Sequence, residues 1–120
     1  MLKVSLDESF VFDLLSILEV KMGKASEENY TKAKLSFEKT SLEIIQQIGK
    51  IKYEEIISSS EYESLFRANG LVFDLVDKAK QDNGVGREMD NANYTRYLRK
   101  MDLQKKFFDG EMLEVKLGYG

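Results

Sequence analysis

The sequence contains no cysteine, no histidine and no proline. Without cysteine the chain can form no disulfide and has no thiol nucleophile. Without histidine it has no Ser–His–Asp triad, no histidine-ligated zinc and no imidazole to move protons near neutral pH. Any chemistry therefore falls to carboxylates, lysine, arginine, tyrosine and hydroxyl groups, or to a hard metal ion held by oxygen atoms.

Long apolar runs and a strong charge of one sign are also missing. No segment is long and apolar enough for a membrane span and the N-terminus does not have the pattern of a signal peptide, so we expect a cytoplasmic protein without membrane association. The net charge of −3 gives no general argument for nucleic acid. With 42% hydrophobic and 32% charged residues in 120, the composition indicates one globular domain over residues 1–120.

Helical periodicity dominates the chain, and the absence of proline favours long helices. A first helix is predicted from an N-cap at Asp7 or Ser9 to Gly23, and its apolar residues lie on so many sides that we expect it to be buried or to dimerise. A second is predicted from Ser26 toward Ile57, bent or shortened at Gly49. Its apolar residues recur every seven positions, which is typical of coiled-coil-like packing, at Tyr30, Phe37, Ile44 and Ile51.

Two further helices follow. The third begins at a capping box formed by Ser60 and Glu63, and a turn at residues 81–86 separates it from the fourth. The fourth runs from about Arg87 to Phe108 and is expected to direct these side chains inward: Tyr94, Tyr97, Leu98, Met101 and Phe108.

The two ends of the chain alternate apolar and polar residues, at Leu2–Leu6 and Met112–Gly120. Such alternation is typical of short strands, and these two could pair within one chain or between two. The predicted fold is therefore all-α: a four-helix, antiparallel helical-hairpin bundle, with a small two-stranded ribbon formed by the terminal segments as an option.

A polar set interrupts the apolar stripes of the last two predicted helices. Asn69 stands in the stripe of the third helix, and an unsatisfied buried amide costs about 1–3 kcal/mol. An antiparallel hairpin would bring partners to it from the fourth helix, which predicts a network of Asn69, Asp77, Asn93, Arg96 and Lys100. The network has two interpretations: it fixes the register of the helices, or it forms a pocket in which Arg96 and Lys100 meet an anion.

Two other sites are possible. Asp74, Asp77 and Asp90 resemble half of the pattern with which helical nucleotide pyrophosphohydrolases of the MazG type hold magnesium, and Mg²⁺ prefers oxygen ligands. Residues 87–106 hold six basic and three acidic side chains, a local charge of +3, with aromatic residues between them that could stack on bases. The aromatic residues follow core spacing, however, which weakens this nucleic-acid interpretation.

Three blocks, taken together in their order, resemble a family of small helical bacterial and phage proteins of unknown function. They are "FDLLSILEVKMGK", "LFRANGLVFDLVDK" and "DNANYTRYLRKMDLQ". The first carries the ILE(I/V)K element and the last the N-x-x-R-x-x-x-K element. The first block corresponds to the family pattern at Asp13, Ser16, Ile17, Leu18, Glu19 and Lys21. The resemblance implies a helical architecture and a shared polar set, the same one that the periodicity indicates: Asn69, Asp77, Asn93, Arg96 and Lys100. It implies no activity.

The pattern as a whole favours a small protein that acts by association, either as a homodimer or by binding a partner protein, and not by catalysis. The broad apolar surface of the first helix, the heptad spacing of the second and the terminal strands support this interpretation. Two alternatives stay open. One is a magnesium-dependent enzyme or binder of a phosphate-bearing, nucleotide-like ligand, with no other cofactor, and the other is weak nucleic-acid binding through the basic last helix.

Overall fold

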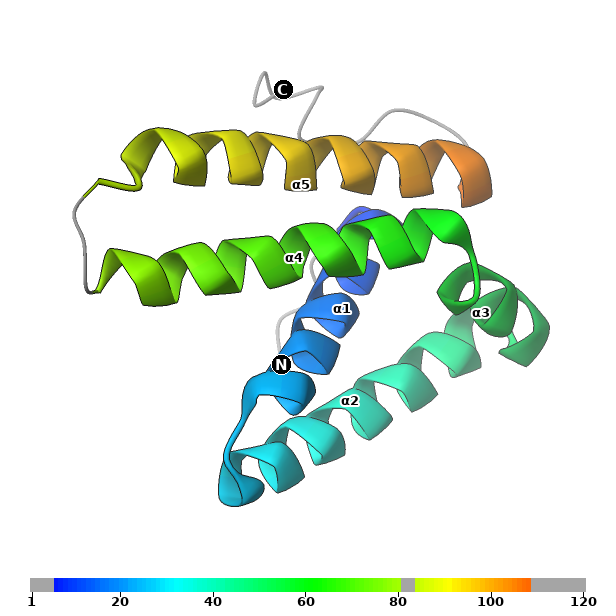
Figure 1. Ribbon diagram of the computed structural model, residues 1–120. Helices are drawn as coiled ribbons and strands as arrows, with labels where there is room; N and C mark the ends of the chain where they lie inside the picture. The colour runs from blue at the N-terminus through cyan, green and yellow to red at the C-terminus, as the bar shows by residue number, and fades with distance from the viewer. Residues whose placement is uncertain (1–5, 81–83, 109–120) are drawn as a thin grey trace.

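A computed structural model describes residues 6–80 and 84–108, which form five helices and no strand. The predicted all-α class is confirmed (Figure 1). The helices are α1 (Glu8–Lys24), α2 (Glu27–Ile48), α3 (Lys50–Ile57), α4 (Ser60–Ala79) and α5 (Gly86–Phe107). The two predicted terminal strands lie outside the described residues, apart from Leu6.

The second predicted helix is in fact two helices, so the count of four was wrong for the described part of the chain. Gly49 has φ 89° and ψ 155°, a conformation that side chains with a Cβ rarely adopt. Its amide still donates to the carbonyl of Ile45 at 2.8 Å, and its own carbonyl accepts from Tyr53 at 3.1 Å. Gly49 thus ends α2 and begins α3 in one residue.

The start of α4 follows the predicted capping chemistry one residue earlier than expected. Ser59, and not Ser60, is the N-cap, and its hydroxyl oxygen accepts a hydrogen bond from the Tyr62 amide at 3.1 Å. Glu61 and Glu63 lie in the first turn, where their negative charges interact favourably with the positive end of the helix dipole.

Figure 1 shows α4 and α5 side by side and antiparallel, with α1 crossing them and α2 leading away from the end of α1. The helix α3 closes the corner between α2 and α4. Fully buried apolar side chains meet where α1, α3, α4 and α5 converge, and each contributes about 1.5–3 kcal/mol by leaving water. The four with no exposed surface are Leu15, Ile56, Leu65 and Leu103. No helix of the described residues is long and apolar enough to cross a membrane.

The faces that two helices bury differ from those expected. On α5 the buried residues are Ala92, Lys100, Leu103 and Gln104, whereas Tyr94 is 58% exposed. On α1 the buried face includes polar residues, and Leu14 is 46% exposed. Both helices place hydrogen-bonding side chains toward the core. The positions of the apolar residues alone therefore predicted the wrong buried face for each helix.

Candidate functional site

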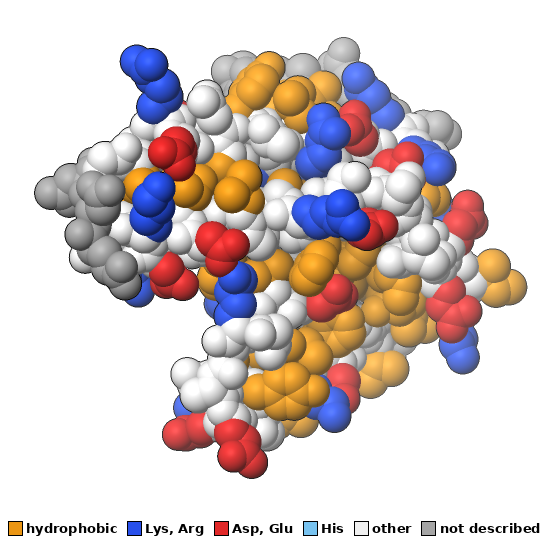
Figure 2. Space-filling model, in the orientation of Figure 1, with side chains coloured by type: hydrophobic (Ala, Val, Ile, Leu, Met, Phe, Trp, Pro, Cys, Tyr) orange, Lys and Arg blue, Asp and Glu red, His pale blue; other side chains and the backbone are white. Residues whose placement is uncertain are grey.

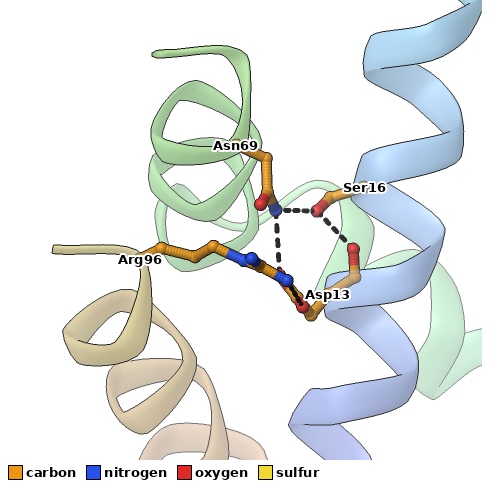
Figure 3. A network of polar contacts seen from close by, with 4 residues as sticks. All are labelled: Asp13, Ser16, Asn69 and Arg96. Carbon is orange, nitrogen blue, oxygen red and sulfur yellow. Dashed lines mark hydrogen bonds and ion pairs between the residues drawn. The ribbon is translucent and has the colours of Figure 1, made fainter. Parts of the chain in front are cut away.

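The polar centre of the molecule is Asp13, on α1. Its side chain is only 3% exposed, and its two carboxylate oxygens accept three hydrogen bonds from two other helices (Figure 3). Arg96 of α5 donates from Nε to Oδ1 at 3.1 Å and from Nη2 to Oδ2 at 2.6 Å. This two-point geometry is the strongest that a guanidinium and a carboxylate form, and it neutralises a charge that would otherwise be costly to bury.

Asn69 of α4 completes the cluster. Its Nδ2 donates to Asp13 Oδ1 at 2.9 Å and to the Ser16 hydroxyl at 2.6 Å. Ser16 in turn donates to the Asp13 carbonyl oxygen at 2.8 Å. Both hydrogens of the Asn69 amide nitrogen are therefore used, and the amide is 1% exposed.

This Asp13 cluster (Asp13, Ser16, Asn69 and Arg96) joins three helices through donors and acceptors that already satisfy one another. A buried, paired network of this kind fixes which residues of neighbouring helices face each other. It presents neither a free carboxylate nor a free amide donor to a ligand, so its geometry favours the register interpretation.

A second long-range contact lies one turn closer to the N-terminus of α1. The N-cap residue Asp7 makes no side-chain cap. Instead, the Ser9 amide donates to Oε1 of Gln104 on α5 at 2.9 Å, and Gln104 Nε2 donates to Glu8 at 2.9 Å. A residue far along the sequence thus satisfies one of the open amides at the start of α1.

The structure brings together two of the five residues predicted to form the polar network. Asn69 and Arg96 meet, but through Asp13, which the prediction did not include. Asp77 and Asn93 are exposed, and Asp77 Oδ1 lies 3.9 Å from Nζ of Lys80, the residue that follows α4. Lys100 is buried on α5, one turn after Arg96.

The three aspartates predicted as magnesium ligands do not form a cluster. Asp74, Asp77 and Asp90 are all exposed, and Asp74 forms an ion pair with Lys24. Within the described ranges, no group of three or more acidic residues lies close enough to hold a metal ion.

At least three of the six basic residues of α5 have acidic partners within the fold. Arg96 pairs with Asp13, Arg99 approaches Asp102 at 3.4 Å, and Lys106 contacts Glu61 at 3.0 Å. This last contact lowers the pKa of Glu61. The local charge of +3 is therefore not presented as a row of unpaired cations, which a phosphate backbone would need.

A groove of about 470 Å³ between α1, α2 and α4 carries basic side chains. Lys21, Lys24 and Lys32 line it together with Phe73 and Asp77. Lys24 pairs with Asp74, and Lys32 lies 3.9 Å from Glu28. Because Lys21 pairs with no acidic residue in the described part of the chain, the groove keeps a positive balance.

Large apolar side chains remain exposed on several helices. On α2, Leu35 is 63% and Leu42 is 60% exposed, and on α3 Ile51 is 85% exposed. Leu35 and Leu42 are seven residues apart, so they share one face two turns long, roughly opposite the buried Ala33 and Ile44. We name this pair the α2 outer face. The predicted heptad was wrong about Ile51, which belongs to α3.

A half-buried acid and a buried phenol meet where α1 crosses the start of α4. The Tyr62 hydroxyl donates to Glu19 Oε1 at 3.3 Å. Burial raises the pKa of Glu19, and the hydrogen bond from Tyr62 opposes only part of that rise. Burial beside this carboxylate also raises the pKa of Tyr62. Both shifts run in the direction in which burial disfavours the charged form.

The sequence prediction missed Asp13 as the centre of the cluster and Gln104 as the cap of α1. A signal was present for Asp13: with Ser9 and Ser16 it follows the spacing of one helix face, in a segment that is otherwise apolar. The reasoning applied to Asn69 would have identified it. Gln104 gave no such signal, because its partners, the Ser9 amide and the Glu8 side chain, lie more than ninety positions away in the sequence.

Comparison of the chain with protein-family models, curated proteins and solved structures gave no match in any of the three. The resemblance to small bacterial and phage proteins therefore stays a hypothesis.

Proposed function

We propose that this protein acts by association and that its first partner is a second copy of itself. The observation that carries the proposal is the α2 outer face, where Leu35 and Leu42 are both more than half exposed. Two leucines two turns apart on a straight helix surface fit the seam of a helix pair. A contact between two copies would remove both from water.

The charges beside the two leucines favour a parallel arrangement of two α2 helices. Glu38 and Lys39 flank the leucine row on opposite sides, and neither pairs with another residue of the described chain. In a parallel pair related by a twofold axis, each Glu38 faces the partner subunit's Lys39. In an antiparallel pair centred at the same place, like charges would meet. We therefore propose a parallel homodimer.

Sedimentation velocity tests this proposal. The wild-type protein is expected to show the mass of two chains, and the double variant Leu35→Glu/Leu42→Glu the mass of one. The matched control is Leu71→Glu, which changes a leucine that is 50% exposed on α4 and should leave the dimer intact. A wild-type mass of one chain over the whole concentration range, or equal loss of the dimer in the control, would refute the proposal.

The groove between α1, α2 and α4 supports a second candidate function, the binding of a phosphate-bearing ligand. Lys21, Lys24 and Lys32 offer three ammonium groups around one hollow. Pyrophosphate is the probe, and a rise in Tm that is lost in Lys21→Ala/Lys32→Ala would support this function. No rise at millimolar pyrophosphate would exclude it.

A further inference from the structure

A second hollow lies in the corner between α1, α2 and the junction of α3 with α4. Its volume is about 370 Å³, within the range typical of small-molecule sites. Aromatic and aliphatic side chains form about half of its lining, at Phe37, Ile57, Tyr62 and Phe66, and Ser58 and Ser59 add polar groups beside them. Figure 2 shows hydrophobic side chains gathered on this face between α4 and α2. We call this hollow the Glu19 cavity.

The charged residues lining the cavity are both acidic. Glu19 and Glu63 both line it, and no lysine or arginine belongs to the lining. Glu63 is paired with Arg67 of its own helix at 2.7 Å, in an exposed contact of little strength. Glu19 has no basic partner among the described residues.

The bonding of Glu19 leaves one oxygen available. Tyr62 donates to Oε1 and thereby orients the carboxyl group, while Oε2 accepts no hydrogen bond from the described residues. A carboxylate that is partly removed from water and lacks an opposite charge is destabilised, which is why burial raises the pKa of Glu19. A cation in the cavity would remove that penalty.

The aromatic walls favour the same kind of ligand. The faces of Phe37, Tyr62 and Phe66 carry negative electrostatic potential and attract ammonium and guanidinium groups. A ligand with a hydrophobic body would also gain binding free energy by burying its apolar surface against these rings. An acid beside aromatic rings therefore favours a ligand that has both a cationic head and an apolar body.

We propose that the Glu19 cavity binds a small organic cation, an ammonium or guanidinium group carried on a compact aromatic or branched aliphatic body. Oε2 of Glu19 accepts a hydrogen bond from the cationic head, and Phe37 and Phe66 cover the body. The cavity lies on the side of α2 toward α1 and α4, away from Leu35 and Leu42, so this binding is independent of the proposed dimer.

Titration with benzylamine, followed by ¹³C–¹H NMR of the intact protein, tests the proposal. Benzylamine is expected to shift the resonances of Phe37, Ile57 and Phe66 to saturation, with affinity at least about tenfold above that of benzyl alcohol or benzoate. Glu19→Gln should lose about tenfold in affinity for benzylamine and none for benzyl alcohol. The control Glu55→Gln, on the exposed side of α3, should bind as the wild type does.

Three outcomes would overturn the proposal. One is the absence of saturable shifts, and another is equal binding of the alcohol and the amine. The third is binding of a lysine- or arginine-containing peptide without binding of benzylamine, since the occupant would then be a protein segment. The comparison of amine with alcohol uses only the wild-type protein, so it decides the question even where Glu19→Gln fails to fold.

Discussion

At the scale of single residues, the molecule depends on polar groups that are buried and paired. Asp13 accepts hydrogen bonds from Arg96 and Asn69, so one carboxylate holds α1 against both helices of the α4–α5 hairpin. Paired charges of this kind contribute little net stability, yet breaking the pair is costly because one charge is left without compensation. A buried pair such as Asp13 and Arg96 can therefore specify how the helices pack even though it adds little to the free energy of unfolding.

Arg96→Ala is therefore expected to destabilise the fold by about 3 kcal/mol, because it leaves the Asp13 carboxylate buried without its cation. Urea unfolding followed by circular dichroism measures the change. The control is Arg67→Ala, which breaks the exposed pair with Glu63 and should cost less than about 1 kcal/mol. Equal losses in the two variants would show that the Asp13 pair is no different from a surface pair.

The raised pKa of Glu19 predicts how the stability of the protein depends on pH. Since burial raises its folded pKa above the ordinary value of 4.5, the contribution of Glu19 to stability is complete below that value. It is lost as the pH rises through the folded pKa. Glu19→Gln imitates the protonated form and keeps an acceptor for the Tyr62 hydroxyl. Its stability relative to wild type should therefore be higher at about pH 7 than at about pH 4. Urea midpoints at the two pH values measure this, and a difference that does not vary with pH would contradict it.

At the scale of the elements, helix ends decide the path of the chain. Ser59 starts α4 with a local side-chain cap, whereas α1 receives its cap from Gln104 of α5. The turn between α2 and α3 depends instead on backbone conformation, since Gly49 adopts a positive φ that a side chain would strain. One glycine therefore separates two helices whose side-chain periodicity predicts a single one.

Replacing Gly49 by alanine is expected to cost about 2 kcal/mol, because the new Cβ strains a backbone region that glycine alone occupies easily. The matched control is Gly70→Ala, within α4, where a Cβ would meet nothing within 4 Å. That substitution should stabilise the protein by about 0.5–1 kcal/mol, since alanine favours the helix. Thermal unfolding of both variants measures the effects, and a loss of stability in both would show that Gly49 is not special.

At the scale of the whole molecule, the core is built on one side of α2 and leaves its other side open. The inner side of α2 buries Ala33 and Ile44. In contrast, the α2 outer face keeps Leu35 and Leu42 in water, although each is large enough to contribute to a core. The proposed dimer gives this face its missing neighbour.

A dimer makes the Tm depend on protein concentration, because unfolding then separates two chains. We expect the Tm of the wild-type protein to rise with concentration and that of Leu35→Glu/Leu42→Glu to stay constant. Calorimetry over a hundredfold range of about micromolar concentrations measures both. A wild-type Tm that does not change would count against self-association even where crystals contain a symmetric pair.

The sequence by itself determined the local features: the all-α class, the approximate helix limits and the serine-capped start of α4. It also placed Asn69 and Arg96 in one polar network, and in the structure both contact Asp13. These follow from periodicity and turn chemistry, which act over a few residues. Only the tertiary structure decided which faces turn inward, that Asp13 is the centre of the cluster, and that Gln104 caps α1. Those outcomes depend on hydrogen bonds between residues more than fifty positions apart, and no local pattern encodes the angle at which helices cross.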